Sequence, residues 1–321
     1  MANLLYLDDS TVKSMLKWTS LIEGIEKALG DLSLSRQGNT EAVIQPPRLI
    51  MPVPQKDGAL LSMPAYLSHQ NALACKIVTS FRNNAAKNLP SINATILLFD
   101  GDTGQVKAVM DGTEITAWRT AAASVVATKH IHRGKKQILA ILGAGMQGRS
   151  HALAFKHFFE FSEIRIWNRT FERAKKLCTD LGAWAVPFRS NEECVRDADV
   201  IVTATYATEP IVQFDWVKIG AHINAVGFGV NHHNELSHPV YENSLLIVDS
   251  VEAANKELSK LIQNNVPIVT EVGSIINKSF TLPSNVRATV FHSLGMAVED
   301  VVSANLVYNS YMEKIKKPTI I

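Results

Sequence analysis

Residues 138–148 read ILAILGAGMQG, a short apolar run that leads directly into a glycine-rich loop. The run, residues 138–142, contains no polar residue, as expected for a strand that is buried on both faces of a parallel sheet. The loop, residues 143–148, has the GxGxxG spacing that joins such a strand to the next helix in dinucleotide-binding folds. The stretch therefore predicts an α/β fold of the Rossmann type, with a strand–turn–helix that binds no ligand as the alternative.

The three glycines of this loop have separate physical tasks. Gly143 permits a tight turn, Gly145 lets the backbone approach a pyrophosphate, and Gly148 lets the helix pack closely against the strand. The free N–H groups at the start of the helix, together with the positive end of its dipole, attract phosphate. We expect the cofactor contacts of this loop to come from Gly143, Ala144, Gly145, Met146 and Gln147.

Strands and helices alternate in the sequence beyond this loop. That alternation predicts a doubly wound parallel sheet with helices on both faces. Helices are expected at residues 149–159 and 171–181, and strands at 163–167, 199–205, 222–227 and 245–249.

The sequence before the loop has a different character. It begins with a helix capped by Asp9 or Ser10, and continues with Pro- and Gly-rich turns between short apolar segments. These segments predict a mostly antiparallel sheet, followed by an Ala-rich helix. The strands are expected at residues 72–79, 94–100 and 105–110, and the helix at 115–129.

Two domains follow from this reading. Residues 1–114 form an α+β domain, and residues 115–292 form the Rossmann domain. A C-terminal segment, residues 293–321 with a helix at 293–311, is expected to return to the first domain.

The composition excludes several classes of protein. The chain has 321 residues, 46% of them apolar, and a net charge of +2, so it lacks the concentrated basic face of a nucleic-acid-binding protein. No segment approaches the ~20 apolar residues of a membrane span, and the first residues do not resemble a signal peptide. The three cysteines form no CxxC pair and are typical of reduced, buried thiols. We expect a cytoplasmic protein without membrane or nucleic-acid partners.

The end of the second predicted strand distinguishes NAD from NADP. NAD sites place an Asp or Glu about 20 residues after the loop, where it binds the ribose 2′-hydroxyl. That position is Asn168, and Arg169 and Thr170 follow it. Arg169 can donate charge-assisted hydrogen bonds to a 2′-phosphate. Residues 168–170 include no carboxylate that would repel this phosphate. The sequence therefore predicts NADP(H), with a plain surface role for Arg169 as the alternative.

Several longer stretches resemble the ornithine cyclodeaminase/mu-crystallin family, and most closely its mu-crystallin branch, over nearly the whole chain. The resemblance implies an NADP-dependent oxidoreductase that is a homodimer formed through the non-Rossmann domain. The matching stretches are VMDGTEITAWRTAA (109–122), ILGAGMQ (141–147), RIWNRT (165–170), ATEPI (207–211), WVKIGAHINAVG (216–227) and SLGMAVED (293–300).

The resemblance also implies that three basic residues, Arg48, Lys76 and Arg119, hold a substrate that carries a carboxylate. A guanidinium can clamp a carboxylate bidentately. Lys76 interrupts an apolar strand, where a charge is costly unless it is paired or functional. As alternatives, Arg48 could lie on the surface and Lys76 could reach solvent. Arg119 could pair with an internal carboxylate, or contact the cofactor phosphates.

The family pattern adds Ser91, Thr205 and Val226 to the cofactor site, and Gly229 to the substrate site. Gly229 stands where the cyclodeaminase and alanine dehydrogenase branches carry an aspartate, which disfavours cyclodeamination. His232 and His233 follow it. With His238 they could suggest a metal site, but no cysteine or carboxylate pattern supports one, so we expect solvent-facing histidines and no metal.

The function implied by the resemblance is reduction of carboxylate-bearing cyclic ketimines by NADPH. Arg48 and Arg119 would orient the carboxylate, and Lys76 would supply a proton, because a desolvated lysine has a lowered pKa. The alternatives are an amino-acid dehydrogenase or a cyclodeaminase of the same family, or a non-catalytic cytosolic protein that binds a thyroid-hormone-like ligand.

Overall fold

A computed structural model describes residues 4–38, 41–87, 89–227 and 234–316, and the chain divides into two compact units. The first unit comprises Met1–Arg119 and Met296–Ile321, and the second comprises Thr120–Gly295. One helix, α3 (Thr113–Ile131), contains the first boundary between them. Gly229, His232 and His233, which the sequence places near the site, lie outside the described residues.

The first unit is built on a mixed sheet in the order β1-β7-β6-β5-β4-β2, with β3 also paired to β4. β1 runs parallel to β7 and the other pairs are antiparallel, which confirms the predicted α+β character. The strands are β1 (Leu5–Leu7), β2 (Val43–Ile44), β3 (Leu49–Val53), β4 (Gly58–Leu67), β5 (Ala72–Phe81), β6 (Ile92–Asp100) and β7 (Val106–Asp111). Short 3-10 turns follow three of them: η1 (Pro54–Lys56), η2 (Ser68–Gln70) and η3 (Arg82–Lys87).

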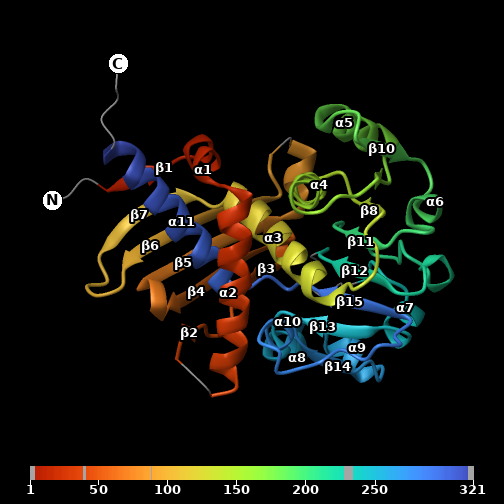
Figure 1. Ribbon diagram of the computed structural model, residues 1–321. Helices are drawn as coiled ribbons and strands as arrows, with labels where there is room; N and C mark the ends of the chain where they lie inside the picture. Colours follow the sequence, from red (N-terminus) through yellow and green to blue (C-terminus); the bar gives the residue numbers. More distant parts are fainter. Residues whose placement is uncertain (1–3, 39–40, 88, 228–233, 317–321) are drawn as a thin grey trace. The chain divides into compact units, whose positions relative to one another are not determined.

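Two long helices cover one face of this sheet. Burial alternates residue by residue along β4, because successive side chains of a strand point to opposite faces. The buried set lies under α2 (Trp18–Arg36) and α11 (Ala297–Lys316), which pack against each other, and α11 also contacts β4, β5 and β6 (Figure 1). The C-terminal helix thus belongs to the first unit, although the whole second unit, Thr120–Gly295, separates it in sequence from the rest of the first unit.

The N-terminal helical region differs in detail from the prediction. It consists of two helices, α1 (Asp9–Met15) and α2, rather than one, because Leu16 and Lys17 have extended backbone. The predicted caps, Asp9 and Ser10, are wrong. The cap is Asp8, whose carboxylate accepts a hydrogen bond from the Thr11 N–H at 2.8 Å.

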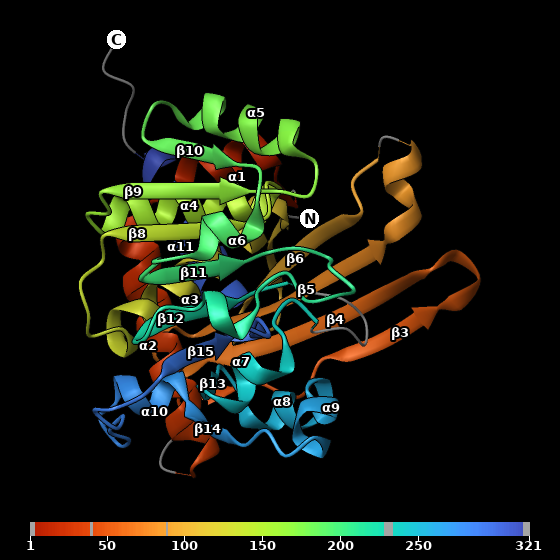
Figure 2. The same ribbon diagram turned by 90° about the vertical axis from the view of Figure 1, so that its right-hand side faces the viewer.

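The second unit is the predicted doubly wound sheet, with every strand pair parallel. Its order is β10-β9-β8-β11-β12-β15-β13-β14, and Figure 2 shows the strands running in one direction. The strands are β8 (Ile138–Leu142), β9 (Glu163–Trp167), β10 (Ala185–Phe188), β11 (Val200–Thr203), β12 (Ala221–Ala225), β13 (Leu245–Val248), β14 (Ile268–Glu271) and β15 (Ala288–His292). The helices are α4 (Met146–Phe158), α5 (Phe171–Leu181), α6 (Asn191–Val195), α7 (His238–Glu242), α8 (Val251–Glu257), α9 (Ser259–Gln263) and α10 (Val272–Ile276), with a 3-10 turn, η4 (Phe214–Trp216).

The strand order creates a switch point beside β8. From β8 the chain proceeds to β9 and β10 on one side, and then crosses to β11 and β12 on the other. Open α/β sheets bind ligands beyond the carboxyl ends of their strands at such a point. The glycine-rich loop follows β8 and therefore lies at the switch point.

Candidate functional site

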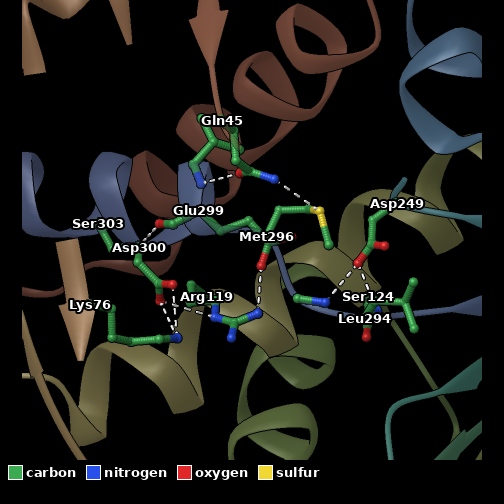
Figure 3. Close-up of polar contacts among 12 residues, drawn as sticks. Gln45, Lys76, Arg119, Ser124, Asp249, Leu294, Met296, Glu299, Asp300 and Ser303 are labelled. Carbon is green, nitrogen blue, oxygen red and sulfur yellow. Dashed lines mark hydrogen bonds and ion pairs between the residues drawn. The ribbon is translucent and has the colours of Figure 1, made fainter. Parts of the chain in front are cut away.

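In the first unit, three elements bring charged side chains together in the interior. Lys76 on β5 lies with its ammonium 2.8 Å from both carboxylate oxygens of Asp300 on α11. Arg119 on α3 donates to Glu299 Oε2 at 2.7 Å, and its Nε lies 3.3 Å from Asp300 Oδ1. Figure 3 shows Lys76 and Arg119 converging on Asp300. We call these four residues, Lys76, Arg119, Glu299 and Asp300, the charged cluster.

The charged cluster is almost completely removed from water. Lys76 and Asp300 are each 1% exposed, so the alternative in which Lys76 reaches solvent is wrong. Its side chain points inward because its strand neighbours Cys75 and Ile77 occupy the other face. Burial, and then the positive charges of Arg119 and Arg48, lower the pKa of Lys76, while Asp300 opposes the shift; together these effects bring it to about 8. A buried lysine tuned in this way can exchange a proton near neutral pH.

The structure also identifies partners of Arg119 within the protein. This side chain pairs with internal carboxylates, Glu299 and Asp300, as one alternative proposed. Arg48 lies just before β3 and is half-buried rather than fully on the surface. The cluster thus holds at least one guanidinium in a fixed direction within a low-dielectric interior.

Gln45 fixes the segment that carries Arg48 against the start of α11. Its side-chain oxygen accepts a hydrogen bond from the Val298 N–H at 2.8 Å, and its amide nitrogen donates to the Met296 sulfur at 3.3 Å (Figure 3). The first of these contacts satisfies an N–H of the first helical turn, which has no partner within the helix. The QPPR segment and the start of α11 are therefore held together in the first unit.

In the second unit, the glycine-rich loop has the geometry that a pyrophosphate requires. Gly143 adopts φ 127°, in the left-handed region, and a Cβ there would come within 2.5 Å of the Ala204 carbonyl oxygen. A Cβ on Gly148 would overlap the Gly143 carbonyl oxygen. A Cβ on Gly145 would meet no atom within 4 Å, so this glycine leaves open space in front of the α4 N-terminus. The loop residues therefore fit a dinucleotide phosphate.

A buried histidine holds the first turn of α4. His151 donates from Nδ1 to the Gln147 carbonyl oxygen at 2.7 Å, and its Nε2 accepts from the Ser124 hydroxyl at 2.9 Å. Burial lowers the pKa of His151 to about 4, so the ring is neutral at physiological pH and can accept this hydrogen bond. The helix start that faces the phosphates is thus fixed from behind.

The residues expected to select NADP lie beside this loop. Asn168 accepts a hydrogen bond from the Ala144 N–H at 3.2 Å, and donates to the Thr170 carbonyl oxygen at 3.0 Å. Its amide therefore joins the loop after β8 to the loop after β9, a role that the sequence did not indicate. Arg169 and Thr170 are exposed, and no ion pair or hydrogen bond of the Arg169 side chain is found within the described residues.

The remaining predicted cofactor residues lie in two places. Thr205 and Val226 follow β11 and β12 and thus lie at the carboxyl edge of the parallel sheet. Ser91 belongs to the first unit, where its carbonyl oxygen accepts the Phe81 N–H at 2.8 Å.

Three buried carboxylates at these sites were missed by sequence reasoning. Glu299 and Asp300 lie in the stretch SLGMAVED, where two acidic residues inside an otherwise apolar helix start are a detectable signal. Glu235 accepts hydrogen bonds from Thr203, Thr205 and Gly227. Nothing in its local sequence, NELSH, marks it.

Two further expectations concern histidines and cysteines. His238 is half-buried and its Nε2 lies 3.4 Å from the Glu242 carboxylate, and no group of three potential metal ligands occurs among the described residues. All three cysteines are free, but only Cys178 and Cys194 are buried, because Cys75 lies on the half-buried face of β5. No helix within the described ranges is long and apolar enough to cross a membrane.

A doubly wound parallel sheet with a glycine-rich loop at its switch point defines a dinucleotide-binding protein of the Rossmann class. A family model described as the ornithine cyclodeaminase/mu-crystallin family matches residues 5–315, and the chain belongs to that family. The predicted family is therefore confirmed.

Similar proteins are known from sequence and from solved structures. Ketimine reductase mu-crystallin of Rattus norvegicus is 42% identical over 307 residues, which cover 95% of this chain and 97% of that protein. The structure of Thermococcus litoralis Delta(1)-pyrroline-2-carboxylate reductase in complex with NADH and L-proline has a TM-score of 0.90 at 33% identity, covering 97% of this chain and 98% of that one. An archaeal alanine dehydrogenase dimer with bound NAD has a TM-score of 0.87 at 29% identity, covering 97% of each chain.

Proposed function

We propose that this protein reduces cyclic ketimines that carry a carboxylate, with NADPH as the hydride donor. The observation that carries the proposal is the charged cluster, in which a buried lysine with a pKa lowered to about 8 lies beside a fixed guanidinium. The names of the similar proteins support it, since a ketimine reductase reduces a C=N bond and a Delta(1)-pyrroline-2-carboxylate reductase reduces one next to a carboxylate.

The residues of the first unit would bind and activate the imine. Arg48 and Arg119 supply guanidinium groups for the carboxylate, and orientation by such a clamp lowers the entropic barrier of the reaction. The Lys76 ammonium donates a proton to the imine nitrogen, which makes the adjacent carbon electron-poor. Asp300 holds the lysine Nζ in place at 2.8 Å. When bound, the nicotinamide supplies the hydride, and the protein supplies orientation and electrostatics.

The second unit would hold the cofactor. Gly143, Gly145 and the α4 N-terminus fit the pyrophosphate, and Asn168, Arg169 and Thr170 offer donors for a 2′-phosphate. The preference for NADPH is our proposal, because the two structural relatives are described with NADH and NAD. It rests on the absence of a carboxylate at Asn168 and on the uncommitted guanidinium of Arg169.

A substrate panel tests the proposed function. Purified protein and NADPH are mixed with cyclic ketimine carboxylates, with pyruvate plus ammonia, and with ornithine, while the absorbance of the reduced cofactor is followed. Consumption of NADPH with cyclic ketimines alone is the expected result. Turnover only with pyruvate and ammonia would indicate an amino-acid dehydrogenase. Tight NADPH binding without any turnover would indicate a non-catalytic binding protein, for which a thyroid-hormone-like ligand is then tested.

Turnover should decrease as the pH rises through about 8. The proton that Lys76 donates is present below its pKa and absent above it, so the loss occurs on the alkaline side. The measurement is kcat/KM against pH for two ketimines whose imine nitrogens differ in pKa, because only the enzyme's ionisation is common to both. Profiles that follow the substrate alone would contradict the role of Lys76.

We also propose that two chains associate through the sheet face that α2 and α11 leave uncovered. The row Tyr66, Leu73 and Phe99 is paired across β4, β5 and β6 on this half-buried face. An apolar sheet face of this kind is typical of an interface between subunits. One structural relative is described as a dimer.

Replacing Leu73 and Leu97 with lysine should convert the dimer to a monomer without unfolding the sheet. In a symmetric dimer the introduced lysines of one chain would be buried against the same face of the other chain, and burying unpaired like charges is unfavourable. Light scattering measures the mass, and Val186→Lys, an exposed position on β10 in the second unit, is the matched control. A wild-type mass of one chain would contradict the dimer.

Free thiols at Cys178 and Cys194 support a reducing compartment, and we place the reaction in the cytoplasm.

A further inference from the structure

Glu235 is a buried carboxylate at the point where two neighbouring parallel strands end. It is 5% exposed and accepts four hydrogen bonds. Its Oε1 accepts from the N–H and the hydroxyl of Thr205, at 2.6 and 2.7 Å. Its Oε2 accepts from the Thr203 hydroxyl at 2.7 Å and from the Gly227 N–H at 2.8 Å. Thr203 is the last residue of β11, and Gly227 follows β12 by two residues.

These contacts hold the carboxylate in one position and favour its charged form. All four partners donate in this arrangement, and the two backbone N–H groups have no means of accepting a proton from Glu235. Burial raises the pKa of Glu235 above its ordinary value, and the four hydrogen bonds reduce that shift without reversing it. The group packs so closely against Gly227 that a Cβ there would overlap it. A fixed negative charge therefore lies at the carboxyl edge of β11 and β12.

The topology relates this charge to the two halves of a dinucleotide. In doubly wound sheets each half of the cofactor lies over one βαβ half of the sheet, on either side of the switch point. The loops after β8 and β9 carry the glycines and Asn168, which fit the adenosine side. The carboxyl ends of β11 and β12 are then left for the nicotinamide side, and this assignment rests on the proposed function.

We propose that Glu235 is an electrostatic positioning residue that favours the oxidised nicotinamide ring over the reduced ring. Hydride transfer breaks a C–H bond at the nicotinamide C4 and forms one at the imine carbon, moves the C=N electron pair onto the protonated nitrogen, and leaves one positive charge on the nicotinamide ring. A buried carboxylate beside the ring stabilises that charge as it develops, whereas it has little effect on the neutral ring. Glu235 therefore makes the bound cofactor a better hydride donor.

The test compares binding of NADP⁺ and NADPH rather than activity. In Glu235→Gln the ratio of the dissociation constant of NADP⁺ to that of NADPH should rise by at least roughly tenfold, as expected for the loss of a charge within about 12 Å of the ring in a medium of effective dielectric about 20. The reduction potential of the bound cofactor should then rise by at least about 30 mV for this two-electron couple. Glu235→Asp, which keeps the charge, should retain most of the wild-type ratio.

Two controls separate the charge from the architecture. Adenosine 2′,5′-bisphosphate, which lacks the nicotinamide, should bind wild type and Glu235→Gln equally. Asp199→Asn is the matched variant, because Asp199 is a buried carboxylate before β11, at the opposite edge of the sheet. The Asp199 carboxylate accepts hydrogen bonds from the backbone N–H groups of Gln137 and Ile138, at 2.8 and 3.0 Å. Its replacement should leave the NADP⁺/NADPH ratio unchanged.

The outcomes distinguish this proposal from the proposed function. An unchanged ratio in Glu235→Gln, or an equal change in Asp199→Asn, overturns the electrostatic role while NADPH binding stands. Glu235→Met is a second neutral variant, and the ratio is read in whichever variant binds the adenosine bisphosphate normally. If neither neutral variant binds it, the carboxylate acts on the whole fold and the proposal is overturned. If the wild-type protein does not bind NADPH, both the proposed function and this role of Glu235 are overturned.

Discussion

Replacing Lys76 with methionine should reduce turnover of a cyclic ketimine by a factor of roughly 10² to 10⁴, the usual contribution of a positioned general acid. Methionine has a similar length and is suited to the buried site, but it has no proton to donate. NADPH binding should be unchanged, because Lys76 lies in the first unit and the predicted phosphate contacts lie in the second. Steady-state kinetics and a fluorescence titration of NADPH measure the two quantities separately.

The same replacement should also destabilise the first unit. Asp300 would lose its partner at 2.8 Å and retain only the Arg119 contact at 3.3 Å. Removing one member of a buried ion pair lowers the free energy of unfolding by about 3–5 kcal/mol, and the remaining arginine should reduce this to the lower end. The double variant Lys76→Met, Asp300→Asn should recover part of the loss in a denaturant titration without recovering turnover.

Lys107→Met is the matched control for this prediction. Lys107 lies on β7 in the same unit, with its ammonium 4.7 Å from the centre of the Tyr308 ring. Its replacement should leave turnover at the wild-type level. Wild-type turnover in Lys76→Met would remove Lys76 from the mechanism.

Replacing Arg169 with alanine should weaken NADPH binding by roughly ten- to hundredfold and NADH binding by less than about threefold. Hydrogen bonds to a charged group contribute about 1.5–3 kcal/mol each, and every 1.4 kcal/mol is about tenfold in affinity. NADH lacks the 2′-phosphate, so the replacement removes no hydrogen bond to this cofactor. Titrations of both cofactors test the difference, and Arg196→Ala, an exposed arginine paired with Glu192, is the control.

Asn168→Asp should change the preference further towards NADH. The new carboxylate can still accept the Ala144 N–H, which is now 3.2 Å from the amide oxygen. It would repel a 2′-phosphate and could accept a hydrogen bond from a 2′-hydroxyl. An equal loss of NADPH and NADH binding in Arg169→Ala would contradict the assignment of the 2′-phosphate site.

The Rossmann unit was predictable because its signals are local. The bounds of β8, β9 and α5 agree with the prediction residue for residue, since continuous apolar runs and glycines mark them directly. The predicted start of α4 was three residues late, at 149 instead of Met146, because the last glycine of the loop, Gly148, lies inside the helix. β15 was missed, because its apolar run, ATVF, lies between two segments without clear periodicity.

The first unit and the charged cluster depend on contacts that are distant in sequence. β4 was missed although its burial alternates perfectly, because its outward positions are also mostly apolar and mask the alternation. Lys76 and Asp300 are 224 residues apart, so no spacing rule could pair them. Sequence reasoning recognised that a buried Lys76 needs a partner, and only the fold identified that partner. Glu235 is a further case, since its four donors come from the carboxyl end of β11 and from the loops after β11 and β12.

The most direct test of the proposed reaction follows the hydride itself. The protein is incubated with a cyclic ketimine carboxylate and NADPH that carries deuterium at the transferred position of the nicotinamide, and the product is analysed by mass spectrometry and NMR. The account predicts a saturated cyclic amino acid with one deuterium on the ring carbon that bears the carboxylate. A product without deuterium at that carbon, or no product while NADPH remains bound, would contradict it.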